Sequence, residues 1–269
     1  ALEFSMYIHR PDGVVPSLSD GDSRSYLDLL NQGAQLFDRK DMAFVSSQGE
    51  EGSPPEVRCA AFSDSGYYVL RSGWESLGEA FSDARYLVFD CGPLGAGNHG
   101  HLDLLNIEVA AFGRPLIIDP GRYTYDENGV INWRVKFRGT AYHNTVQVDG
   151  KQQTRYEPGL VKYKIKGPAP DYELRSYISN PGMDFLHGIA RSHEYDAIHE
   201  RRIMFIKGEY WIVIDDLTSL TEHCYDLRFH LGAEAQNHLG LSRVGDAWVV
   251  NTPGLIMASP HNCNGEPII

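Results

Sequence analysis

The chain has 269 residues, with 24 basic and 36 acidic side chains, a formal net charge of −12 and 42% hydrophobic residues. This composition is typical of a soluble globular protein and excludes collagen, coiled coil and disorder. The length allows one large β domain or two smaller ones. No apolar run reaches the roughly 18 residues of a membrane span, and the negative charge disfavours nucleic acid as a partner.

The cysteines and the chain ends leave the cellular compartment open. Cys59, Cys91, Cys224 and Cys263 lack the close spacing of a disulfide framework or a cysteine-rich zinc module, so two disulfides or four thiols would both fit. The chain opens on Ala1 without a basic and apolar leader, and it stops on GEPII without a convincing final strand. We therefore expect both ends to be cut from a longer protein.

The N-terminal part predicts a helix. Residues 22–45 place apolar side chains at helical spacing behind an Asp- and Ser-rich start, which indicates one helix near residues 23–37. The following segment, residues 46–56, is rich in Ser, Gly, Pro and Glu and is typical of a linker.

From residue 58 onward the pattern is one of successive strands. Runs rich in Val, Ile, Tyr and Phe are separated by Gly, Asp, Asn or Pro. The clearest hairpin joins Phe205 to Trp211 through a short polar turn. The predicted fold is mainly β, a large antiparallel β-sandwich preceded by a short α-helical segment. The expected strands fall within 58–73, 84–92, 104–113, 114–119, 143–150, 172–179, 199–208, 209–217 and 224–231.

Candidate metal ligands lie in the middle of the chain. His99 and His101 are two residues apart, so an extended backbone would point both imidazoles to one face. Asp119 ends an apolar strand before a Pro-Gly turn, and His143 opens another strand. Two imidazoles and a carboxylate are ligands that zinc accepts, with a fourth position left for water or substrate. Hydrogen-bonded core histidines and an ordinary turn explain the same spacing, so both interpretations stay open.

The charge is distributed unevenly. Residues 121–166 hold nine basic side chains against four acidic ones. This segment could receive an anionic ligand, or it could be a solvated face of a β protein.

A more specific signal comes from two long runs, NHGHLDLLNIEVAAFGRPLIIDPGRYTY and NWRVKFRGTAYHNTVQVDGKQQ. They contain HGH-x-D, D-P-G, W-R-x-x-F-R and H-N-T-V-x-V-D-G in this order. Over residues 60–231 the chain resembles the heparinase II/III-like polysaccharide lyases, which have an α-helical toroid followed by an antiparallel β-sandwich. The resemblance implies that residues 1–57 are a remnant of the toroid with its linker. Residues 58–269 would then be the sandwich, truncated at its C-terminus.

The resemblance also implies a metal site and a catalytic histidine. By motif, the ligands of a structural ion, zinc or another divalent metal, would be His101, Asp119 and His143. His99 would lie beside the substrate and take part in catalysis.

Neighbouring residues complete the predicted site. Tyr123 and Tyr125 are candidates for a second proton transfer, with packing in the sheet as the alternative. Arg122, Arg134 and Arg138 are candidates for holding a carboxylate or sulfate, with structural ion pairing as the alternative. The remaining histidines and tryptophans are expected to be structural, although Trp133 could line the cleft; they include His187, His193, His199, His223, His230, His238, Trp211 and Trp248.

The implied function of the full-length protein is cleavage of a uronic-acid-containing polysaccharide, glycosaminoglycan or alginate-like, by β-elimination. The net charge favours an alginate-like or lightly sulfated chain. A relative that acts on a bacterial exopolysaccharide, or a non-catalytic carbohydrate-binding or structural module, would also fit.

The same resemblance sets the expected context. The partners would be an anionic polysaccharide or oligosaccharide and the missing toroid of the same protein, with no nucleic acid and no membrane. A homodimer is left open. We expect a bacterial periplasmic or secreted location and little or no activity from the isolated chain.

Overall fold

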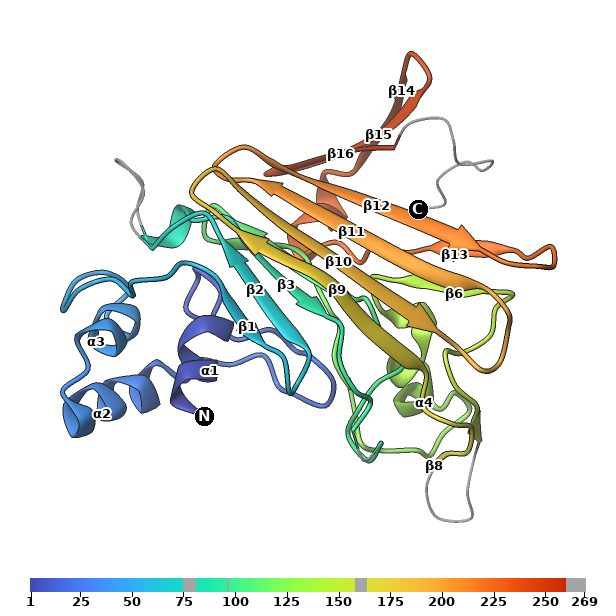
Figure 1. Cartoon of the computed structure of the whole chain (residues 1–269), viewed down its shortest axis with the longest axis horizontal. Coiled ribbons are helices and arrows are strands. Elements are labelled where there is room, and N and C mark those ends of the chain that lie inside the picture. The colour runs from blue at the N-terminus through green and yellow to red at the C-terminus, as the bar shows by residue number, and fades with distance from the viewer. Residues whose placement is uncertain (75–80, 96, 158–163, 260–269) are drawn as a thin grey trace.

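The computed structural model describes residues 1–74, 81–95, 97–157 and 164–259 (Figure 1). Two antiparallel sheets pack face to face, and three helices lie at the N-terminal end. The predicted fold class, a mainly β antiparallel sandwich after a short helical segment, is confirmed. None of the helices in the described part of the chain is long and apolar enough to cross a membrane.

The first sheet has its strands in chain order: β1 (Ala60–Phe62), β2 (Tyr67–Arg71), β3 (Tyr86–Asp90), β4 (Ile107–Ala111) and β5 (Arg114–Ile117). Every residue of β4 is buried, so this strand is covered on both faces. A strand that is covered on both faces has a nearly continuous run of apolar residues, which is why the sequence predicted a strand in this region.

The second sheet is a meander of four nine-residue strands: β9 (Asp171–Ser179), β10 (Met183–Arg191), β11 (Ile198–Ile206) and β12 (Tyr210–Thr218). Burial alternates strictly along β11, as expected for a strand with one face on the core. The sequence did not predict β10, because Asp184, His187 and Gly188 interrupt its apolar pattern.

The predicted hairpin between β11 and β12 is confirmed. Phe205 pairs with Trp211 and Ile206 with Tyr210, and Gly208 in the turn has φ of 82°. The rings of Phe205 and Trp211 stack with centroids 5.0 Å apart, so Trp211 belongs to the core as expected.

Helices cover the outer face of the first sheet: α1 (Leu2–Ile8), α2 (Leu27–Phe37) and α3 (Lys40–Ser46). Their buried side chains share one cluster with residues of β2, β3 and β4. The single helix expected near residues 23–37 is thus α2 with a later start, and α1 and α3 were not predicted. Asp38, with φ of 50° at the end of α2, turns the chain so that α3 packs as a separate helix.

Smaller elements complete the fold. β6 (Val146–Val148) pairs with β13 (Tyr225–Leu227), and β7 (Tyr156–Glu157) pairs with β8 (Lys164–Ile165). A third sheet near the C-terminus, which the sequence did not predict, contains β14 (Gly240–Val244), β15 (Ala247–Thr252) and β16 (Leu255–Ser259). The short helices are α4 (Trp133–Arg138) and the 3₁₀ turns Phe81–Asp83, Thr140–Tyr142 and Ala233–Asn237.

Three cysteines are free thiols in the structure. Cys59 and Cys91 are buried, and Cys224 is exposed. Cys263 lies outside the described residues.

Gly188 sets how closely the two sheets approach. A Cβ atom on this residue of β10 would lie 2.7 Å from Cζ of Phe89 in β3 and 2.8 Å from Cδ2 of Leu105. We therefore predict that Gly188→Ala lowers the free energy of unfolding by about 1–3 kcal/mol through overpacking.

Urea denaturation checks this prediction, with Gly182→Ala as the matched control. A Cβ on Gly182 meets only Asn180 Oδ1 at 4.0 Å, so its effect should stay within about 0.5 kcal/mol. Equal effects of the two substitutions would contradict the assigned contact.

A histidine bridges two loops at one end of the sandwich. His223 Nδ1 lies 2.7 Å from Asp149 Oδ2, and its Nε2 contacts Asp196 Oδ1. The hydrogen bonds with Asp196 and Asp149 raise the pKa of His223 above its ordinary value of 6.5. Lys151 also faces Asp149, at 3.9 Å, and the Tyr225 ring lies 6.0 Å from the imidazole. The proton on His223 therefore links the two loops.

The sign of the resulting pH dependence follows from the raised pKa. The stabilisation that protonated His223 gives through Asp149 and Asp196 is fully present below the ordinary histidine pKa. It is lost as the pH rises through the raised pKa of His223. We predict that the unfolding temperature falls more steeply between about pH 6 and pH 9 in the native chain than in His223→Gln. Thermal scans across that range test this, with His193→Gln, which removes a histidine paired with Asp171, as the control. Parallel curves for the native chain and His223→Gln would refute it.

Candidate functional site

The structure brings the three predicted metal ligands together. His101 lies in the loop before β4, Asp119 follows β5, and His143 follows the 3₁₀ turn Thr140–Tyr142. One donor atom from each lies within 4.8 Å of the other two, and all three side chains are buried. The rings of His101 and His143 have centroids 5.2 Å apart. His143 precedes β6 rather than opening a strand, because the 3₁₀ turn occupies the preceding residues.

Hydrogen bonds orient each of these side chains. Asp119 Oδ2 accepts from His143 Nδ1 at 2.8 Å and from Asn106 Nδ2 at 2.6 Å, while its Oδ1 accepts from Gly121 N at 2.8 Å. His143 Nε2 and His101 Nδ1 are buried and have no hydrogen-bond partner among the described residues. Buried nitrogens of this kind are normally bonded, so the cluster contains two donor atoms that an ion could satisfy.

Burial and neighbouring charged groups shift the pKa values of these three side chains in opposite directions. Burial would lower the pKa of His143, but the Asp119 carboxylate raises it above the ordinary value. Burial lowers the pKa of His101, although its hydrogen bond to the Asp20 carboxylate acts in the opposite direction. Burial would raise the pKa of Asp119, but the charge of His143 and its hydrogen bond lower it. The cluster therefore favours a carboxylate at Asp119 beside His143.

Asn144 fixes the backbone next to His143. Its N–H donates to Asn106 Oδ1 at 2.9 Å, and its side-chain amide donates to the carbonyls of Ile107 and Ile118 at 2.8 and 2.9 Å. Its Oδ1 accepts from the backbone N–H of His230 at 2.6 Å. One buried amide thus ties His143 to β4 and to the segment that carries Asp119.

Arg201 connects this region to the second sheet. The guanidinium is fully buried on β11 and donates to the carbonyls of Asn144 and Leu105 at 2.5 and 2.7 Å. Asp215 of β12 pairs with it through both oxygens, at 2.7 and 3.1 Å, and also contacts His199 Nε2 at 2.6 Å. His199 is therefore a hydrogen-bonded core histidine, as expected.

The two histidines of the HGH motif differ in exposure. Residues 99–103 form an irregular loop rather than a strand. The His99 side chain is 74% exposed, whereas that of His101 is fully buried. The extended backbone assumed for this motif is therefore not observed, and the loop exposes His99 to solvent while it buries His101.

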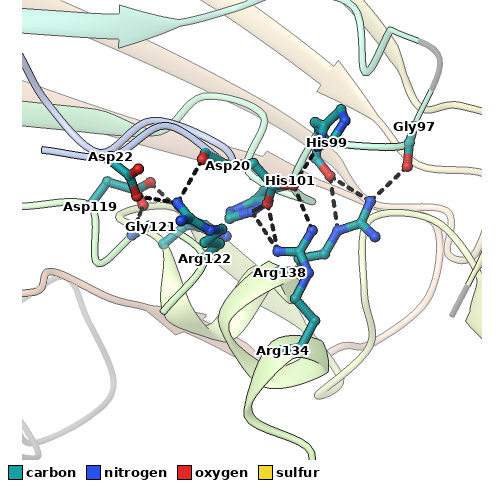
Figure 2. A network of polar contacts seen from close by, with 12 residues as sticks. Asp20, Asp22, Gly97, His99, His101, Asp119, Gly121, Arg122, Arg134 and Arg138 are labelled. Carbon is teal, nitrogen blue, oxygen red and sulfur yellow. Dashed lines mark hydrogen bonds and ion pairs between the residues drawn. The ribbon is translucent and has the colours of Figure 1, made fainter. Parts of the chain in front are cut away.

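Asp20, which the sequence analysis missed, holds both histidines (Figure 2). His99 Nδ1 lies 2.7 Å from Asp20 Oδ2, and His101 Nε2 lies 3.0 Å from Asp20 Oδ1. Burial alone would raise the pKa of Asp20, but the hydrogen bonds from His101, His99 and Arg134 hold it well below the ordinary value. A lone aspartate in a loop some 80 residues from its partners gives no signal in the sequence.

Two of the predicted anion-binding arginines are buried and bonded within the protein. Arg134 on α4 reaches Asp20 through both of its terminal nitrogens, at 2.6 and 2.8 Å. Arg138 donates to the carbonyl oxygens of Gly97 and Gly100 at 2.7 and 2.8 Å. The geometry therefore places both guanidinium groups in the scaffold of the site, and their binding of substrate stays a prediction.

The third arginine and the two tyrosines lie nearer the surface. Arg122 contacts Asp22, and its guanidinium carbon lies 4.4 Å from the ring centroid of Tyr125. Tyr125 and Tyr123 are 57% and 67% exposed, so neither packs in the sheet. Tyr123 stacks on Phe137 with centroids 4.9 Å apart. Trp133, expected to be structural or to line the cleft, is 39% exposed beside these rings. Catalytic roles for the tyrosines stay predictions.

Comparison with known proteins decides the family. Residues 54–261 match the family described as Heparinase II/III-like, C-terminal. The chain belongs to this family. A heparin-sulfate lyase from Bacteroides thetaiotaomicron is 27% identical over 249 residues, which cover 86% of this chain and 33% of that protein. A heparin-sulfate lyase from Bacteroides stercoris is 24% identical over 238 residues, 86% of this chain and 32% of that protein.

Solved structures with a similar fold extend the comparison. A heparinase III gene product superposes with a TM-score of 0.76 at 22% identity, over 92% of this chain and 36% of that one. The heparan sulfate lyase HepC from Pedobacter heparinus gives a TM-score of 0.74 at 20% identity, over 91% of this chain and 36% of that one. The chain thus spans about a third of the length of these relatives.

Proposed function

We propose that this chain is the sandwich part of a polysaccharide lyase that cleaves a uronic-acid-containing glycosaminoglycan by β-elimination. The observation that carries the proposal is the alignment of 86% of the chain with proteins named heparin-sulfate lyases. The exposed His99 beside the buried cluster of His101, Asp119 and His143 gives that alignment a chemical site.

We propose that His101, Asp119 and His143 hold a divalent ion, zinc first. The unpartnered nitrogens His101 Nδ1 and His143 Nε2, together with the Asp119 carboxylate, fit such an ion in donor type and burial. When bound, the ion supplies positive charge that joins three chain segments around a buried carboxylate. Its part is structural, since the ligands are buried whereas His99 is exposed.

In the proposed mechanism, exposed side chains carry out the proton transfers. In β-elimination a base removes the proton at C5 of the uronate, the C4–O bond breaks, and the electron pair of the former C–H bond becomes the C4=C5 double bond. His99 is the proposed base, and Tyr125 or Tyr123 is the proposed donor of the proton that the leaving oxygen takes up. Arg122, which is partly exposed beside Tyr125, is the proposed partner of the uronate carboxylate.

Two observations bear on the substrate. The names of the relatives favour a heparan-type glycosaminoglycan. The net charge of −12 favours a lightly sulfated chain over a heavily sulfated one, because a negative protein repels a dense polyanion. Heparan sulfate with few sulfates satisfies both, and alginate is the second choice.

The proposed ligand set predicts which substitutions release the metal. His101→Ala and His143→Ala should each reduce bound zinc from about one ion per chain to nearly none, since two remaining ligands cannot complete a tetrahedral site. Metal analysis by mass spectrometry after dialysis measures this. His187→Ala, which removes a histidine paired with Glu200 on the second sheet, is the control and should keep its zinc. Stoichiometric zinc in His101→Ala would show the ligand assignment to be wrong.

The proposed reaction is tested on the complete protein that contains this chain. We expect a new ultraviolet-absorbing double bond with heparan sulfate, and weaker or no signal with chondroitin and alginate. His99→Ala should keep its metal and lose roughly 10²–10⁴-fold in turnover, the usual contribution of one well-placed proton transfer. Absence of product on every uronate polymer, with metal present, would instead favour a non-catalytic carbohydrate-binding module.

A further inference from the structure

One carboxylate lies between the two histidines of the HGH motif. Asp20 Oδ2 lies 2.7 Å from His99 Nδ1, and Asp20 Oδ1 lies 3.0 Å from His101 Nε2. The Asp20 side chain is only 6% exposed and the His101 side chain is fully buried, whereas His99 meets the same carboxylate from the solvent side at 74% exposure. Figure 2 shows the aspartate beside His101, with His99 directed away from the buried cluster.

The guanidinium of Arg134 keeps Asp20 in its carboxylate form and in place. Its two terminal nitrogens donate to Asp20 Oδ1 at 2.6 Å and to Oδ2 at 2.8 Å. Arg122 donates to the Asp20 backbone carbonyl at 3.0 Å. Because each carboxylate oxygen already faces a guanidinium, the imidazole nitrogens that approach it must donate as well.

This requirement fixes the tautomer of each neutral imidazole. His101 Nε2 lies 3.0 Å from Asp20 Oδ1 and 3.5 Å from Arg134 Nη1, so the carboxylate oxygen is its nearer partner. His101 therefore carries its proton on Nε2, which leaves the lone pair on Nδ1, the buried nitrogen without a partner among the described residues. His99 must carry its proton on Nδ1, which leaves the lone pair of Nε2 on the side of the ring away from Asp20. A neutral imidazole has one donor nitrogen and one acceptor nitrogen, so each ring is left with a single basic position.

We propose that Asp20 is a positioning residue that sets both tautomers, and so presents His101 Nδ1 to a metal ion and His99 Nε2 to a substrate. The use of these two nitrogens rests on the function proposed above, whereas the tautomers themselves do not. A simpler role, neutralising the buried Arg134, would require no particular tautomer at either histidine.

Nitrogen-15 NMR of the 269-residue chain with labelled histidine tests the tautomers directly. At roughly pH 8.5, where an ordinary imidazole is neutral, we expect the Nε2–H tautomer at His101 and the Nδ1–H tautomer at His99. Adding zinc should shift the Nδ1 resonance of His101. The opposite tautomer at either residue, or a zinc shift at His101 Nε2 instead, would overturn the proposal without any variant.

Substitution of Asp20 separates positioning from charge neutralisation. The amide of Asp20→Asn has one acceptor oxygen and one donor nitrogen, so it cannot accept from both imidazoles, and at least one histidine should change tautomer. Zinc affinity, measured by competition with a chelator, should fall roughly 10–100-fold, as for other residues that orient metal ligands. Asp22→Asn, two residues away and paired with Arg122, is the matched control and should leave the tautomers and the affinity unchanged.

The complete protein adds a kinetic test. Asp20→Asn should lower kcat roughly 10–100-fold with little change in KM, because it misorients a base without removing a substrate contact. An unchanged kcat in a folded variant with altered tautomers would overturn the part of the proposal that concerns His99. A protein that shows no lyase activity, but has the expected tautomers and zinc shift, would instead refute the proposed reaction and support the role of Asp20.

Discussion

The site depends on one buried cation on the second sheet. Arg201 reaches from β11 to the carbonyls of Asn144 and Leu105, and Asp215 neutralises it through both oxygens. Removing one partner of such a buried pair typically costs about 3–5 kcal/mol, so the two sheets and the loop before β6 are strongly coupled. The ligand cluster is therefore held by the interface between the sheets, although none of its three residues lies within a strand.

Much of the fold could be predicted because long apolar runs and turn residues report directly on strands. β3, β4, β11 and β12 were expected from such runs. β10 was missed because its glycine and charged residues do not form the apolar pattern of a strand. The glycine is needed there because Phe89 of the opposite sheet occupies the space beside Gly188. The helices α1 and α3 were missed for a related reason. Each has seven residues, too few for a helical period to stand out, and packing on the first sheet stabilises them.

In the candidate site, too, some residues could be predicted from the sequence and others could not. His101, Asp119 and His143 could be chosen from ordered motifs, and the structure places their donor atoms within 4.8 Å of one another. Arg134 could be chosen as a candidate for ion pairing, but its partner Asp20 could not, because the two meet only after the chain has folded over more than a hundred residues. Sequence motifs identified the residue types that carry chemistry, whereas the groups that orient them are set by tertiary contacts.

The N-terminal segment also supplies a buried charge to the outer face of the first sheet. Arg10 pairs at 2.6 Å with Glu108 of β4, whose other oxygen accepts from the backbone N–H of Asp119 at 3.3 Å, and burial raises the pKa of Glu108 to about 7. A buried ion pair therefore joins the residues before position 57 to the first sheet. Loss of residues 1–25 would leave the buried side chains of Glu108 and Arg134 without the partners Arg10 and Asp20, so the first segment contributes to the stability of the first sheet and of the candidate site.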